Sequence, residues 1–196
     1  MKALYKILLL LSTFHYSLFT ASAQEIEWQK IIGGSGYDEL YSLQQTTDGG
    51  YIVAGYSHSN DGDVTGNHGG VDYWIVKLTV NGDIAWQKSL GGSYHDFVTA
   101  IQQCTDGGYI VAGSSFSVDG DVTGNHGSYD YWIVKLDAAG TLTWQKSFGG
   151  SDYEDATAIQ QCADGSSIVA GRSSSIDGDV TGNHGGINYW IVKLAI

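Results

Sequence analysis

The chain has 196 residues and a formal net charge of −12 at pH 7, with 9 lysines and arginines against 21 acidic residues. This balance excludes nucleic-acid binding and attachment to anionic membranes through a basic surface, because phosphate groups are bound by clustered lysine and arginine side chains. Two cysteines are too few for a disulfide framework, and we expect Cys104 and Cys162 to be unpaired, partly buried thiols.

Residues 1–23 have the three parts of a secretory signal peptide. Lys2 and Lys6 form a basic start, an apolar run follows from Ile7 to Leu11, and Ala21-Ser22-Ala23 has the small residues of a cleavage site. The apolar run is shorter than the roughly 20 residues that span a bilayer. We therefore expect cleavage after Ala23 and a secreted, extracellular or cell-surface protein that is not inserted in the membrane.

Residues 24–196 predict a single domain of three repeats that follow one another every 58 residues without a gap. Trp28-Gln29-Lys30 returns at Trp86 and Trp144, and the segment that begins at Tyr73 returns at Tyr131 and Tyr189. We place the repeats at about 28–85, 86–143 and 144–196. A repeat of this kind is one supersecondary unit that buries its apolar surface against its neighbours.

Four strands are predicted in each repeat, taken here in the first. A weak strand over 40–46 is followed by the turn Asp48-Gly49-Gly50 and a short apolar strand over 51–54. Residues 73–78 alternate in the manner of a strand, and Asn81-Gly82 joins them to a strand around Trp86 as a hairpin. No helical periodicity follows residue 23. The sequence therefore predicts an all-β protein.

The order of the strands suggests how the two ends of the domain meet. The chain enters on the Trp28 strand and leaves on the strand over 189–194, and these two types of strand are consecutive everywhere else in the sequence. The N-terminal strand is therefore expected to complete the last four-stranded unit and to close a ring, which removes exposed edge strands.

Three segments of the second repeat carry a family resemblance: Asp106 to Gly113 (DGGYIVAG), Asp130 to Asp137 (DYWIVKLD) and Trp144 to Gly150 (WQKSFGG). They resemble the tandem repeats of secreted bacterial surface proteins, and the resemblance covers residues 26–196. It implies β-propeller-like blades. A β-trefoil or a three-sheet β-prism with threefold pseudosymmetry is the alternative, since propellers usually need 4–8 blades. If the three units form an open arc, its apolar end faces predict self-association.

A loop that recurs in every repeat is the candidate metal site. In the first repeat it runs from Asp61 to Asp72, with oxygen-bearing side chains at positions 1, 3, 5 and 12 and a glycine at position 6, which resembles a calcium loop. The candidate Ca²⁺ ligands are Asp61, Asp63, Thr65, Asp72, Asp119, Asp121, Thr123, Asp130, Asp177, Asp179 and Thr181. The alternative is a tight connecting loop in which Asp and Asn side chains accept hydrogen bonds from backbone amides.

Two further patterns have simple structural interpretations. The loop histidines His68, His126 and His184 occur once per repeat, so they form a transition-metal site only if the repeats surround a tight threefold axis. Residues 33–41 match the nine-residue calcium β-roll repeat, but the match occurs once, and we interpret it as a turn between strands.

The sequence gives no catalytic constellation, and we predict that the chain is not an enzyme. Recurring acids favour a structural role over a catalytic one, because a catalytic site usually breaks the symmetry of a repeat. The candidate ligand-binding residues are aromatic residues of variable turns: Tyr37, Tyr94, Tyr129 and Tyr153. The predicted function is a non-catalytic extracellular binding or scaffold protein with a glycan or protein partner. The alternatives are a calcium-stabilised structural or adhesion array and, third, a protein associated with glycoside hydrolases.

Overall fold

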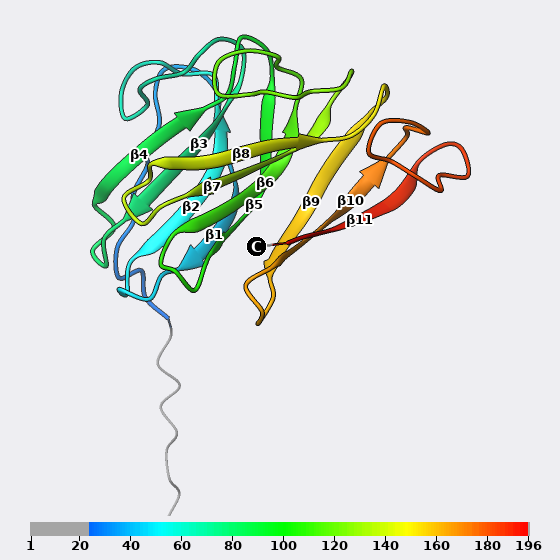
Figure 1. Cartoon of the computed structure of the whole chain (residues 1–196). Helices are drawn as coiled ribbons and strands as arrows, with labels where there is room; N and C mark the ends of the chain where they lie inside the picture. The colour runs from blue at the N-terminus through cyan, green and yellow to red at the C-terminus, as the bar shows by residue number, and fades with distance from the viewer. Residues whose placement is uncertain (1–23, 196) are drawn as a thin grey trace, which may run out of the picture.

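The protein is all-β in the computed structural model, which describes residues 24–195. The predicted signal peptide lies outside the described residues. Three antiparallel sheets form (Figure 1): β1 (Asp38–Gln45), β2 (Tyr51–Ser57), β3 (Asp72–Leu78) and β4 (Ile84–Leu90); β5 (Asp96–Gln103), β6 (Tyr109–Ser115), β7 (Asp130–Leu136) and β8 (Leu142–Phe148); and β9 (Glu154–Gln161), β10 (Ser167–Ser173) and β11 (Asn188–Leu194). Between residues 24 and 195 we find no helix that could cross a membrane.

Strand formation follows the local sequence signals. The third strand of each repeat is rich in aromatic and β-branched residues, and it pairs with the strand before it over seven residues in the same register in all three repeats. The predicted hairpin at Asn81-Gly82 joins β3 to β4, and Gly82 has a φ of 78°, a backbone angle that glycine adopts without strain. Four strands per repeat are confirmed for the first two sheets.

The sheets stack face to face, and the first strand of each, an edge strand, lies beside that of the next sheet: β1 neighbours β5, and β5 neighbours β9. One core cluster joins the first sheet to the second and includes Tyr73 and Trp132, both 0% exposed. A second cluster joins the second sheet to the third through Tyr131 and Trp190. Between these neighbouring first strands, the amide of Ile101 on β5 donates to Ser42 Oγ on β1 over 3.2 Å. Stacking therefore buries most of the apolar surface that a single sheet would expose.

The expected closure of the ring within one chain is not formed. Residues 24–33 make no strand, and Trp28 instead packs on its own first sheet, with its ring 5.7 Å from that of Tyr51. Among the described residues β11 has no strand on its outer edge, and no core cluster joins the third sheet to the first. The physical reason is that Trp28 is held at one end of the stack and β11 lies at the other.

The two cysteines are unpaired, as predicted. Cys104 is buried and Cys162 is half-buried, and burial raises the pKa of the Cys104 thiol. Both therefore act as small apolar side chains.

Candidate functional site

Aromatic side chains from all three repeats form a continuous surface strip near the N-terminal ends of β1, β5 and β9. We call it the aromatic strip. Its members come from β1, β2 and β5, from the loops that precede β1, β5, β7 and β9, and from the residues that directly follow β2 and β6: Tyr37, Tyr41, Tyr56, His58, Tyr94, His95, Phe97, Phe116, Tyr129 and Tyr153.

Ring-to-ring contacts connect these residues across repeat boundaries. The ring centroids of Tyr41 and Tyr56 are 5.3 Å apart, and those of Tyr56 and Phe97 are 5.1 Å apart. Phe97 stacks on Tyr129 at 6.0 Å, and Tyr129 contacts Tyr153 edge-on at 5.5 Å. These separations are those of favourable aromatic pairs. The strip is therefore one connected surface that crosses both junctions between sheets.

A side branch of the strip is strongly exposed to solvent. Phe116 lies 5.1 Å from Tyr129 and 5.6 Å from Tyr94, measured between ring centroids. Tyr94 is 51% exposed and Phe116 is 37% exposed, whereas Tyr129, which contacts Phe116, is half-buried. Tyr129 is thus the residue through which the branch and the main strip connect.

Polar groups hold the strip at its two ends. In the first repeat Tyr56 Oη donates to Glu39 Oε2 over 2.5 Å, and this hydrogen bond raises the pKa of the Tyr56 hydroxyl well above its usual value. In the third repeat the Arg172 guanidinium lies over the Tyr153 ring, 5.3 Å from its centroid, and donates to Asp155 over 3.0 Å. Contact with Tyr153, followed by the charge of Asp155, raises the pKa of Arg172.

The strip has the chemistry of a stacking surface with polar edges. Aromatic faces pack on the apolar faces of sugar rings, while hydroxyl, carboxylate and guanidinium groups hydrogen-bond to sugar hydroxyls. Glu39 is bound to the strip residue Tyr56, and Asp155 is bound to Arg172, whose guanidinium lies over the strip residue Tyr153; these contacts hold both acids at the edges of the surface.

The structure brings all four predicted ligand-binding tyrosines to this surface. Tyr94, Tyr129 and Tyr153 are connected as described, and Tyr37 joins through His58, with centroids 6.3 Å apart. The sequence interpretation missed the other six members of the strip: Tyr41, Tyr56, His58, His95, Phe97 and Phe116. A usable signal was present: the counterparts of Tyr56 in the other repeats are Ser114 and Arg172, and those of Phe97 are Glu39 and Asp155, so these positions break the repeat.

The first two carboxylates of each candidate calcium loop accept hydrogen bonds from backbone amides that lie outside the loop. Asp61 Oδ1 accepts a hydrogen bond from the Ser35 amide over 2.7 Å, which lowers the pKa of Asp61, and Asp63 Oδ2 accepts one from the Gly33 amide over 3.1 Å. Asp119 and Asp177 bind the amides of Ser93 and Ser151 in the same way, and Asp121 and Asp179 bind those of Gly91 and Gly149. Thr65 and Thr123 accept hydrogen bonds from Gln87 and Gln145.

The last position of each loop is directed inward. Asp72 and Asp130 are 0% exposed and accept hydrogen bonds from the amide and the ring of the loop histidine, with ring Nδ1 distances of 2.7 Å for His68 and 2.6 Å for His126. Asn188 takes this position in the third loop and donates to Asn183 Oδ1. Across residues 24–195 no group of three metal-ligating side chains forms. The observed contacts are those of connecting loops whose acids bind backbone amides.

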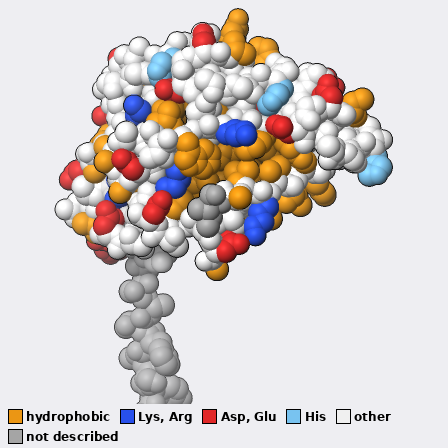
Figure 2. All heavy atoms as spheres, viewed as in Figure 1, with side chains coloured by type: hydrophobic (Ala, Val, Ile, Leu, Met, Phe, Trp, Pro, Cys, Tyr) orange, Lys and Arg blue, Asp and Glu red, His pale blue; other side chains and the backbone are white. Residues whose placement is uncertain are grey.

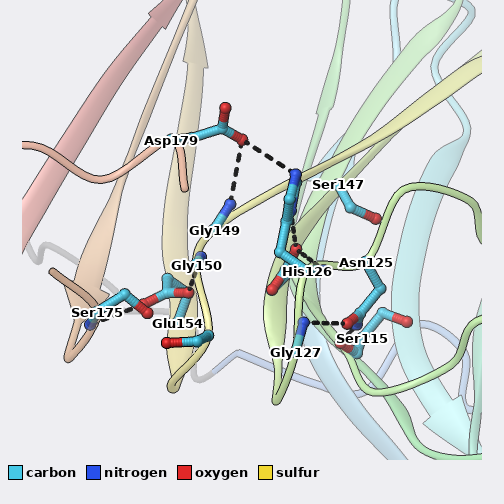
Figure 3. Close-up of polar contacts among 12 residues, drawn as sticks. Ser115, Asn125, His126, Gly127, Ser147, Gly149, Gly150, Glu154, Ser175 and Asp179 are labelled. Carbon is cyan, nitrogen blue, oxygen red and sulfur yellow. Dashed lines mark hydrogen bonds and ion pairs between the residues drawn. The ribbon is translucent and has the colours of Figure 1, made fainter. Parts of the chain in front are cut away.

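The loop histidines contribute to the contacts between neighbouring sheets. Figure 3 shows Asp179, on the loop between β10 and β11 of the third sheet, joined by dashed lines to the Gly149 amide and to the His126 ring. His126 Nε2 lies 3.9 Å from Asp179 Oδ2, and His68 Nε2 lies 3.8 Å from Asp121 Oδ2 at the previous junction. Each histidine thus faces the loop of the next repeat.

A pair of buried acids lies at each internal junction. Asp72 of the first repeat adjoins Asp96 of the second, and an oxygen of each has no hydrogen-bond partner among the described residues. Asp130 and Glu154 form the corresponding pair at the next junction. Burial, with a smaller contribution from the charge of Asp72, raises the pKa of Asp96 to about 6. Asp96 therefore binds a proton at a higher pH than an exposed aspartate does.

Comparisons with known proteins place the chain in no family. No family model matches it, and no curated protein is similar to it in sequence. A solved structure of a protein of unknown function from Bacteroides caccae is similar with a TM-score of 0.29 and 13% identity, over 67% of this chain and 56% of that one. The chain thus spans just over half the length of that protein.

Proposed function

We propose that the chain is a non-catalytic, extracellular binding protein built of propeller-type blades, and that its aromatic strip binds glycan chains. The observation that carries the proposal is the continuity of the strip: Tyr41, Tyr56, Phe97, Tyr129 and Tyr153 make successive ring contacts through all three repeats. A linear polysaccharide presents sugar rings in a row, which suits a row of aromatic faces.

The distribution of sequence variation supports a binding role for the strip. Residues that repeat without change, such as Tyr73, Tyr131 and their strand neighbours, pack the sheets together. The strip lies where the repeats differ, and its Tyr153 ring is covered by Arg172, the one cation after residue 23 that stands outside the two recurring lysine positions. Surface residues that differ between repeats, beside core residues that are the same in each repeat, are expected where a ligand is recognised.

The net charge of −12 favours neutral glycans over acidic ones as ligands. A polyanionic glycan would be repelled by so acidic a protein, whereas a neutral polysaccharide would not. The blade assignment agrees with three sheets that adjoin along their first strands and stack face to face. The predicted signal peptide agrees with an extracellular ligand.

The test is affinity electrophoresis of the purified chain in gels with and without a soluble neutral β-glucan, xylan or galactomannan. One of these polymers is expected to retard the protein, and Tyr129→Ala is expected to weaken binding about tenfold, since Tyr129 joins both arms of the strip. Val118→Ala is the matched control, because Val118 is 66% exposed and is not a strip residue. Equal retardation of both variants would contradict the site, and no retardation by any of the polymers would contradict the ligand class.

A further inference from the structure

We infer that two copies of this chain join head to tail into a closed ring of six sheets, in which residues 26–32 of each copy pair with β11 of the other. The inference is independent of glycan binding. It rests on a junction between neighbouring sheets that the chain forms twice internally, and whose two complementary halves both remain open at the ends of the stack.

The outer face of the third sheet is the first open half. Tyr73 and Tyr131 are 0% exposed because each is covered by the next sheet, whereas Tyr189, at the same position of the third repeat, is 95% exposed. Ile75 and Ile133 are likewise 0% exposed, against 62% for Ile191. The third sheet therefore presents the same apolar side chains that form the core elsewhere.

The first sheet contains a pocket at the position that such a tyrosine fills. At each internal junction the tyrosine hydroxyl reaches the glycine of the next sheet: a Cβ built on Gly113 would lie 2.6 Å from Tyr73 Oη, and one built on Gly171 would lie 2.7 Å from Tyr131 Oη. The corresponding glycine of the first sheet is Gly55. It lines a pocket of about 200 Å³ together with Val53, Leu40 and Trp74.

The partner hydrogen bond for the inserted tyrosine is also predictable. Tyr73 Oη donates to the carbonyl of Trp132 over 3.1 Å, and Tyr131 Oη donates to that of Trp190 over 3.0 Å. The next carbonyl in this series is that of Trp74, which lines the pocket. We therefore place the Tyr189 ring of one copy on Trp74 of the other, with its hydroxyl bonded to the Trp74 carbonyl.

The edge of β11 and the N-terminal segment are complementary. β3 pairs with β4 and β7 pairs with β8 in one register, in which Lys88 lies opposite Ile75 and Lys146 lies opposite Ile133. Residues 28–30 repeat the sequence of 86–88, so this register places Lys30 of one copy opposite Ile191 of the other.

The N-terminal segment already holds the position that pairing requires. Trp28 lies against Gly82 and Tyr51 as Trp86 lies against Gly140 and Tyr109, with the same 5.7 Å between the ring centroids. Pairing with a second copy thus calls for no rearrangement of the segment.

A groove beside β11 offers the space for the incoming strand. It has a volume of about 870 Å³ and lies between β8 and β11, lined by Trp144, Phe148, Val192 and Leu194 among others. Figure 2 shows hydrophobic side chains gathered around this part of the surface. At the first junction Leu142 and Trp86 pack on one core cluster. Ile26, the counterpart of Leu142 in the N-terminal segment and 78% exposed, would cover Trp144 in the same way.

Polar side chains of the third repeat are also complementary to polar side chains of the first repeat. The series in which His68 faces Asp121 and His126 faces Asp179 would continue with His184 of one copy facing Asp63 of the other. The buried pairs Asp72–Asp96 and Asp130–Glu154 would continue as Asn188 with Asp38. An amide opposite a carboxylate hydrogen-bonds without a shared proton, which suits a junction that two separate chains must form.

Two copies are the number that the geometry of rings favours. A head-to-tail contact closes into a ring only when its rotation sums to a full turn, and otherwise it makes a filament. Two copies give six sheets, within the range of 4–8 over which sheets usually close around an axis. Three copies would give nine, outside this range.

The experiment begins with the molar mass of the purified chain by light scattering after size-exclusion chromatography. The expected mass is that of two chains. Tyr189→Asp buries a carboxylate in the pocket and is expected to raise the dissociation constant of the dimer about 100-fold or more. It should leave the circular dichroism spectrum unchanged, because Tyr189 is 95% exposed within one chain. Val118→Asp is the exposed control and should remain dimeric.

A cysteine pair tests the register and the closure together. In a Cys104→Thr, Cys162→Thr background, Lys30→Cys with Ile191→Cys is expected to oxidise to a covalent dimer, while either cysteine alone gives none. A disulfide within one chain would show that a single copy closes by itself, and a ladder of larger products would show an open filament. Either result, or a monomer without a disulfide, would overturn the proposal.

Discussion

The Tyr73 ring packs on Trp132 of the next repeat with their centroids 4.6 Å apart, and the Tyr73 hydroxyl donates to the Trp132 carbonyl. Tyr131 and Trp190 make the same contact at 4.7 Å. One residue pair thus supplies both apolar burial and a directed hydrogen bond at each internal junction. Sheets that would be marginal alone are thereby fixed to one another in a defined register.

Tyr73→Phe is expected to destabilise the chain by about 1–2 kcal/mol, because the substitution leaves the buried Trp132 carbonyl without this donor. Tyr94→Phe is the control, since Tyr94 is 51% exposed, and it should change stability by less than about 0.5 kcal/mol. Urea unfolding followed by tryptophan fluorescence measures both. Equal urea midpoints for Tyr73→Phe and Tyr94→Phe would show that the Tyr73 hydroxyl contributes nothing to stability.

Gly113→Ala is expected to cost about 3 kcal/mol or more, because the new Cβ would lie 2.0 Å from the Phe97 carbonyl oxygen and 2.6 Å from Tyr73 Oη. Gly124→Ala is the control, because it introduces backbone strain without a clash. Gly124 has a φ of 79° with no atom within 4 Å of the new Cβ, so its cost should be about 1 kcal/mol. Thermal unfolding measures both variants. A smaller loss for Gly113→Ala than for Gly124→Ala would refute the close approach of the Phe97 carbonyl and the Tyr73 hydroxyl to Gly113.

Stability is expected to fall as pH rises from about 4 to 7. Burial raises the pKa of Asp96 to about 6 in the folded chain, above the ordinary value of 3.8, so its contribution is complete below pH 4 and is lost as the pH passes 6. Asp96→Asn should weaken this dependence, while Asp72 and Asp130, whose pKa burial also raises, keep part of it, and it should raise stability at pH 7 by roughly 2–3 kcal/mol. Denaturant midpoints across this range test the sign.

Asp152→Asn is the control for that titration, because Asp152 is exposed. It should keep the pH profile of the unchanged chain. A flat profile for the unchanged chain would mean that Asp96 titrates in the folded state as it does in an unfolded one.

Calcium and a chelator are expected to leave the melting temperature unchanged, because Asp61, Asp119 and Asp177 already bind the backbone amides of Ser35, Ser93 and Ser151. Asp119→Ala should lower the melting temperature slightly, with or without calcium, through the loss of the hydrogen bond from the Ser93 amide. A rise of several degrees with calcium that Asp119→Ala abolishes would establish the calcium loop instead.

Much of the site could be anticipated from variation within the repeat. Tyr129 and Tyr153 were predicted as surface aromatics of variable turns, and both lie on the strip. Phe97 and Tyr56 escaped prediction because alternation along a strand assigns each residue to a face of its own sheet. It does not tell which side chains of different sheets meet at the edge where those sheets adjoin.

The sequence alone determined the three repeats, the strand pattern and the unpaired cysteines, because these follow from spacing and alternation along the chain. Only the tertiary structure decided that Trp28 stays on the first sheet while Tyr189 is left exposed at the other end of the stack. The angle between stacked sheets results from side-chain packing at each junction. This angle determines how far three sheets extend around an axis, and it cannot be predicted from the sequence of one repeat.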